Sequence, residues 1–94
     1  MQNLQYLEFI DLKNNRIGHH LAGFLAEIVD MNKRNLKVID LRWNDLGELG
    51  AKALLSTLGH NKNIKFLGLE DNRISTGTLM EIESFLRINT GAED

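Results

Sequence analysis

The chain has no cysteine and no proline among its 94 residues. Without cysteine it cannot form the disulfide framework on which small secreted domains usually depend. The sequence also has no N-x-S/T glycosylation acceptor, no signal-peptide pattern and no apolar run long enough to cross a bilayer. These absences predict an intracellular, cytoplasmic protein. The lack of proline favours one uninterrupted architecture without a stiff linker.

An excess of charge of one sign is also missing. Eleven basic and 13 acidic residues give a formal net charge of -2. Nucleic acid and anionic membranes both attract strongly basic surfaces, so we expect neither as the main partner. A chain of 94 residues that is 43% hydrophobic is long enough for one domain with a thin core.

Motifs for catalysis and for ligand binding are absent. The sequence contains no glycine-rich dinucleotide loop, Walker loop, H-E-x-x-H, G-x-S-x-G or EF-hand loop. His19 and His20 are adjacent, but a metal site needs further ligands that converge on them, so we interpret both as exposed residues where a helix begins. His60 is interpreted as a solvated turn residue. We therefore expect no enzyme activity, no cofactor and no metal.

The chain does contain three copies of one pattern. Asn15, Asn44 and Asn72 are spaced 29 and 28 residues apart, and each occupies the same place in L-x-x-L-x-L-x-x-N-x-L. The aliphatic positions of the three copies are Leu7, Ile10, Leu12, Ile17; Leu36, Ile39, Leu41, Leu46; and Ile64, Leu67, Leu69, Ile74. This pattern resembles the leucine-rich-repeat family.

Each copy predicts a strand followed by a helix. Alternation over residues 10–13 and 39–42 has period 2, which indicates a short strand with one buried side. An asparagine three residues past the last strand leucine can bond the backbone where the ladder ends, so stacked copies would align the three amides in a column. Helical spacing follows each strand, over residues 21–29, 51–58 and 79–86.

The run Leu46-Gly47-x-x-Gly50-Ala51-x-x-Leu54 is similar to the long, helix-containing subtype of the family, found in ribonuclease inhibitor and NOD-like receptors. That resemblance implies an α/β solenoid, a horseshoe arc with a parallel sheet on its concave face and helices on its convex face. The glycines would let the second helix start close to its strand. We expect one domain over residues 1–94, with repeats at about 7–35, 36–63 and 64–90. Copies one and three depart from the subtype where their helices begin.

The amino-terminal end predicts an uncovered flank. Residues 1–6 are too few for a capping helix, and an uncapped parallel sheet exposes its first edge. We therefore expect either a fragment of a longer array or self-association and packing through this edge. Extracellular members of the family usually carry disulfide-bonded caps, and this chain has no cysteine to build them.

A second resemblance points to a cellular setting. Residues 10–17 and 41–47, with a last repeat whose helix ends the array, look like the final repeats of the leucine-rich-repeat, coiled-coil proteins of centrosomes and ciliary bases. The same motifs also occur in NOD-like receptors. The resemblance implies a cytoskeletal, centrosomal or ciliary location.

The repeat also predicts which side chains share the concave face. The strand positions that point outward form rows, because equivalent residues of successive strands lie side by side. These rows are Phe9, Val38, Phe66; Asp11, Asp40, Gly68; Lys13, Arg42, Glu70; Asn14, Trp43, Asp71; and Arg16, Asp45, Arg73.

We predict a protein-binding site on this face. The row of Phe9, Val38 and Phe66 is either an exposed apolar stripe or is covered by the aliphatic stems of neighbouring basic residues. Trp43 is either an exposed anchor or is half buried under the loop that leaves the strand. The function predicted is a non-enzymatic scaffold for a protein partner. The alternative is a stacking unit of a larger array, or a regulatory repeat arm of a multidomain protein, as in NOD-like receptors.

Overall fold

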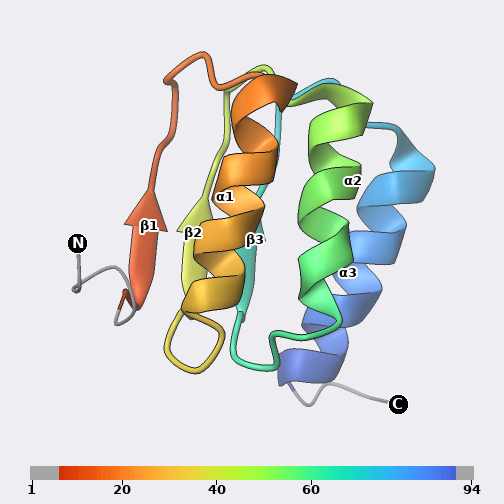
Figure 1. Ribbon diagram of the computed structural model, residues 1–94. Helices are drawn as coiled ribbons and strands as arrows, with labels where there is room; N and C mark the ends of the chain where they lie inside the picture. The colour runs from red at the N-terminus through yellow and green to blue at the C-terminus, as the bar shows by residue number, and fades with distance from the viewer. Residues whose placement is uncertain (1–6, 91–94) are drawn as a thin grey trace.

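The computed structural model describes residues 7–90, in which short strands and long helices alternate (Figure 1). The elements are β1 (Phe9–Asp11), α1 (His19–Met31), β2 (Val38–Asp40), α2 (Gly47–Leu58), β3 (Phe66–Gly68) and α3 (Thr76–Thr90). The prediction of a mixed α/β domain with three parallel strands and three helices is confirmed.

The three strands form an open parallel sheet in the order β1-β2-β3. Phe9 pairs with Val38 and Val38 with Phe66, so equivalent positions of the repeat lie side by side. Backbone pairing continues past the strand ends, because Leu12 N donates to Asp40 O at 2.9 Å. The alternation that extends beyond residue 11 in the sequence therefore reflects a ladder longer than the regular strand.

All three helices lie on one side of the sheet, side by side in chain order (Figure 1). Each helix turns its apolar side to the back of the sheet, which removes this surface from water and supplies the main driving force for folding. The buried core contains Ile17, Ala22, Leu25, Val29, Leu36, Ile39, Leu41, Leu46, Ala51, Leu54, Leu58, Ile64, Leu67, Leu69 and Ile82. This layer holds the strands rigidly and leaves the opposite face of the sheet uncovered.

Burial is uneven along the sheet. The inward residues of β2 and β3 and of the positions next to them are buried, whereas Leu7, Ile10 and Leu12 are only half-buried. β2 has a strand on each side, whereas β1 and β3 are the two edge strands of the sheet. The amino-terminal flank is therefore the less covered end of the core.

The two glycines at the start of α2 have different roles. Gly47 has φ of +68°, a left-handed conformation that favours glycine. A Cβ on Gly50 would lie 3.0 Å from Leu46 Cβ and 3.4 Å from Ala22 Cβ. Gly50 therefore lets the start of α2 lie close to α1 and to the turn that precedes the helix.

Candidate protein-binding face

The face of the sheet that turns away from the helices, here called the open face, carries a row of apolar side chains. Phe9 is 61% exposed and Phe66 is 44% exposed, with Val38 half-buried between them. The sequence left open whether the stems of Lys13 and Arg42 cover this row. In the structure the two phenyl rings stay accessible to solvent, so the three residues form an exposed apolar stripe.

Four charged residues next to the stripe bind one another and are here called the charge cluster. Lys13 Nζ lies 2.7 Å from Asp11 Oδ2 and 3.6 Å from Asp40 Oδ2. Arg42 donates from Nε to Asp40 Oδ1 at 2.9 Å and from Nη2 to Asp40 Oδ2 at 2.7 Å. The second pair is bidentate, the geometry in which arginine and carboxylate match best.

These contacts shift the pKa of every member of the charge cluster. The side-chain hydrogen bond from Arg42 lowers the pKa of Asp40, and the one from Lys13 lowers the pKa of Asp11. In return, Asp11 raises the pKa of Lys13 and Asp40 raises the pKa of Arg42. All four groups therefore stay charged at neutral pH, and their charges cancel within the cluster.

Gly68 makes room for this arrangement. It stands in the row where the other two strands have Asp11 and Asp40. A Cβ at position 68 would lie 2.8 Å from Asp40 Oδ1, 3.1 Å from Arg42 Cγ and 3.1 Å from Phe66 Cε2. The missing side chain thus leaves space into which the ion pair and the phenyl ring lean.

Trp43 stands at the end of the second strand and is held from two sides. Its Nε1–H donates to Asp71 Oδ2 at 2.9 Å, and the Arg42 guanidinium lies 5.3 Å from the ring centroid. The side chain is 49% exposed. Trp43 is thus neither free nor covered by the loop, and a ring held in one place loses little entropy when a partner contacts it.

The backbone at this row is left-handed in all three repeats. Asn14, Trp43 and Asp71 have φ of 58°, 58° and 61°. Asparagine and aspartate tolerate this region, but a bulky residue such as tryptophan is rarely found there. The conformation carries a small local cost at Trp43 and fixes the direction in which its side chain leaves the sheet.

The last row is charged and exposed. Arg16 and Arg73 also have left-handed φ values of 57°, and Arg73 Nη2 forms an ion pair with Asp45 Oδ1. Both partners are exposed, so solvent screens the pair. Within residues 7–90, the side chains of Arg16 and Glu70 are exposed and make no ion pair. Arg16 and Glu70 are therefore among the charges of the open face that a partner can still neutralise.

Asn44 links two neighbouring repeats behind the open face. Its Nδ2 donates to Leu12 O and to Leu41 O, both at 2.9 Å. Its Oδ1 accepts from Asn15 N at 2.8 Å and from Ile17 N at 2.9 Å. One amide thus pairs backbone groups of two turns that the ladder itself leaves unpaired.

Asn72 repeats this role one step further along the sheet. Its Nδ2 donates to Leu41 O at 2.8 Å and to Leu69 O at 3.1 Å, and its Oδ1 accepts from Leu46 N at 3.2 Å. The side chain is almost fully buried. Asn15 differs, because it is exposed and its Nδ2 donates to a carbonyl of its own repeat.

A second set of asparagines lies at the opposite end of the strands, and sequence reasoning missed it. Asn32 and Asn61 follow α1 and α2, Asn89 lies in the last turn of α3, and the three are again spaced 29 and 28 residues apart. Asn32 Oδ1 accepts from Leu7 N at 2.9 Å, Asn61 Oδ1 accepts from Ile64 N at 3.0 Å, and Asn89 Nδ2 donates to Asn61 O at 2.9 Å. The signal was present in the spacing. It was overlooked because these asparagines stand outside the leucine pattern.

Glu48, on the helix side of the molecule, joins α2 to the start of α3. Its carboxylate accepts hydrogen bonds from Ser75 N and Ser75 Oγ, both at 2.9 Å, and from Thr78 Oγ1. Ser75 Oγ in turn accepts from Thr78 N at 3.2 Å, as an N-cap does. The Thr78 hydroxyl makes the largest contribution to lowering the pKa of Glu48, followed by the Ser75 backbone N–H.

We expect the stability that Glu48 contributes to depend on pH. Its folded-state pKa lies below the ordinary value of 4.5, so the contribution is present above pH 4.5 and is lost as the pH falls through the folded-state pKa. The melting temperature of wild type should exceed that of Glu48→Gln at neutral pH, and this difference should shrink on acidification. A constant difference across the acid range would show that the carboxylate charge has no part in the contact.

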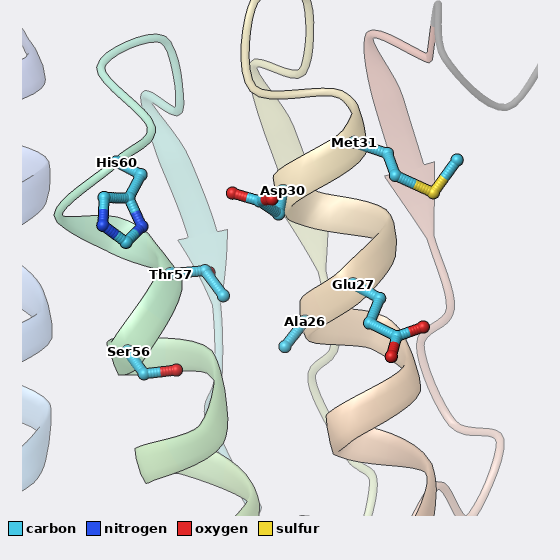
Figure 2. A pocket seen from close by; sticks show the side chains of 7 residues that line it. All are labelled: Ala26, Glu27, Asp30, Met31, Ser56, Thr57 and His60. Atoms are coloured by element: carbon cyan, nitrogen blue, oxygen red, sulfur yellow. The ribbon is translucent and has the colours of Figure 1, made fainter.

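The helix side also contains a shallow hollow of about 490 Å³ between the carboxyl-terminal halves of α1 and α2 (Figure 2). Its lining residues are Ala26, Glu27, Asp30, Met31, Ser56, Thr57 and His60. Asp30 extends from α1 toward α2, whereas Met31 extends away from it (Figure 2). Across residues 7–90 no three His, Asp or Glu side chains converge to hold a metal ion. In the same part of the chain no helix is long and apolar enough to span a membrane.

Comparisons with known proteins agree with this geometry. A family model described as "Leucine Rich repeat" matches residues 32–55. No curated protein matches the chain by sequence. A solved structure, "Leiomodin-1 Actin-Binding Site 2 (ABS2)", has a TM-score of 0.75 and 18% sequence identity, and the match covers 97% of this chain and 70% of that one. The family model supports leucine-rich repeats within residues 32–55, and the solved structure supports a similar fold over most of the chain.

Proposed function

We propose that this chain is a non-enzymatic binding module of an intracellular leucine-rich-repeat scaffold, and that it holds a protein partner against its open face. In this proposal the open face is the concave side of a horseshoe arc, and residues 1–94 form a single leucine-rich-repeat domain. The observation that carries the proposal is the exposed apolar stripe of Phe9, Val38 and Phe66 beside the anchored ring of Trp43.

The stripe and Trp43 suit the centre of an interface. Such centres are enriched in aromatic residues and depleted of unpaired charge, while the rim stays polar. The charge cluster is neutral as a whole, so burying it against a partner leaves no unmatched charge on this chain. Arg16, Glu70 and the Asp45–Arg73 pair lie exposed at the rim, where they favour partners with opposite charges.

We further propose a cytoplasmic role in a cytoskeletal assembly. The solved structure with the similar fold is named as an actin-binding site of leiomodin-1. Actin is therefore the first partner to test. The resemblance of residues 10–17 and 41–47 to repeats of centrosomal and ciliary proteins also favours a cytoskeletal setting.

The test is co-sedimentation with purified actin, together with capture of partners from cell extract. We expect Phe9→Ser/Phe66→Ser to weaken binding about tenfold or more, because both rings are exposed in the free chain and would be buried by the partner. Lys52→Ala, an exposed change on the helix side, is the matched control and should bind like wild type. Binding lost in Lys52→Ala but kept in the double variant would place the site on the helices.

One observation favours the alternative function of an assembly unit. Leu7, Ile10 and Leu12 are half-buried where their equivalents in the second repeat are buried. A repeat buries this flank by stacking on a neighbour. The chain could thus also serve as a unit that stacks through its amino-terminal edge.

A further inference from the structure

The outer edge of β3 has a backbone N–H group that could bond a further parallel strand. Leu12 N donates to Asp40 O across β1 and β2, and Leu41 N donates to Gly68 O across β2 and β3. Leu69 is the equivalent of Leu12 and Leu41 in the third repeat. Within residues 7–90 its backbone N–H has no acceptor. An unpaired backbone N–H at the edge of a sheet is a ready donor for a further strand, so this edge favours an added parallel strand.

The outer edge of β1 has the complementary groups. Asp11 O occupies the place in its strand that Asp40 O and Gly68 O occupy in theirs. Asn15 likewise corresponds to Asn44 and Asn72, whose amides each reach back to a carbonyl of the preceding repeat. The outer edge of β1 thus has an acceptor, Asp11 O, at the position that corresponds to the donor Leu69 N at the outer edge of β3.

The apolar surfaces beside the two edges also differ in shape. On α1, the flank away from α2 carries Leu21, Phe24, Ile28 and Met31 at helical spacing, and Leu21, Phe24 and Met31 are more than half exposed. At the other end, a hollow of about 230 Å³ lies between β3 and α3. It is lined by Phe66, Leu67, Gly68, Leu69, Glu70, Leu79, Ile82, Glu83 and Leu86. One end offers projecting apolar side chains and the other an apolar hollow.

We infer that copies of this chain stack head to tail, with β1 of one copy added in parallel beside β3 of the next and α1 packed on α3. The contact continues the interfaces that β1 makes with β2 and β2 with β3. It unites two different surfaces, so the assembly does not close at two copies and grows into longer oligomers. The inference deepens the assembly role and does not depend on partner binding by the open face.

The charges at the joint favour this stacking. The row of Lys13, Arg42 and Glu70 would continue with Lys13 of the next copy, which places opposite charges side by side. Arg73 would meet Arg16 of the next copy. Both of these arginines are exposed, so salt and solvent weaken their repulsion.

Disulfide trapping tests the geometry directly, because the chain has no cysteine of its own. Lys13→Cys and Glu70→Cys would lie on adjacent strands of neighbouring copies, at a separation that a disulfide can span. In an equal mixture of the two variants we expect the mixed disulfide in clear excess over the share that random pairing gives. A random share, or an excess of Lys13→Cys paired with itself, would overturn head-to-tail stacking.

Sedimentation velocity of the 94-residue chain supplies the second measurement. Wild type should show a series of oligomers that grows with protein concentration, and Phe24→Glu should shift the population to monomer, since it places a charge in the apolar joint. Trp43→Ala, on the open face, should associate like wild type even where it loses partner binding. A wild-type chain that stays monomeric at high concentration, or a Phe24→Glu chain that still associates, would refute the inference.

Discussion

Trp43→Ala should weaken binding to the partner by about 2 kcal/mol or more, a factor of about 30 in the dissociation constant. The indole ring is half exposed in the free chain, and its Nε1–H is already paired with Asp71, so a partner gains apolar contact without having to order the side chain. Folding should change little, because Trp43 is not one of the residues of the buried core. Titration calorimetry and a urea melt of the same variant measure the two effects separately.

Trp43→Phe is the matched control for this experiment. It keeps an apolar ring at the site but removes the hydrogen bond to Asp71. We expect an affinity between those of wild type and Trp43→Ala, because most of the loss comes from buried ring area. Wild-type affinity in Trp43→Ala would exclude the tryptophan from the interface.

The largest effect on stability should come from the asparagines between repeats. Asn44→Ala leaves backbone groups of two turns without partners and should cost about 1 to 3 kcal/mol, with a similar cost for Asn72→Ala. Asn15→Ala should cost only a few tenths, since an exposed polar group can be replaced by water. Urea unfolding of the three variants gives the comparison.

Equal losses in all three variants would contradict this account, since within residues 7–90 the side chains of Asn44 and Asn72 connect neighbouring repeats and that of Asn15 bonds only within its own. Hydrogen exchange adds a local measurement. Asn44 Oδ1 accepts from Asn15 N and Ile17 N, so these two amides should exchange faster in Asn44→Ala. Faster exchange throughout the chain would indicate a general destabilisation.

The order of the elements and the rows of the open face could be predicted because both follow from the period of the repeat. Once the chain forms parallel strands 29 and 28 residues apart, Phe9, Val38 and Phe66 have to lie side by side. The same spacing predicts the row of Asp11, Asp40 and Gly68. Spacing therefore determined which residues are neighbours.

Spacing could not determine how neighbouring side chains share their bonds. The Arg42 guanidinium donates two hydrogen bonds to Asp40. An arginine that the sequence predicts to contact a partner is therefore paired within the chain. The leucine pattern also gives no role to Glu48, whose carboxylate binds Ser75 and Thr78 in the following repeat. These choices depend on side-chain conformers and on where α3 begins, which the leucine pattern does not specify.

The comparisons with known proteins do not distinguish between subgroups of leucine-rich-repeat proteins. The match over residues 32–55 and the similar fold support leucine-rich repeats in general. The ribonuclease-inhibitor-like subtype and the centrosomal or ciliary setting stay predictions, because both depended on short motifs that several groups of the family share.

The space at Gly68 also matters for protein engineering. A consensus design that averages the three repeats would write aspartate at position 68, as at Asp11 and Asp40. Its Cβ would come within 2.8 Å of Asp40 Oδ1, so the arginine fork would have to turn away from its carboxylate. The most regular sequence is therefore not the best-packed one, and the order in which these three units are joined carries information that their average would erase.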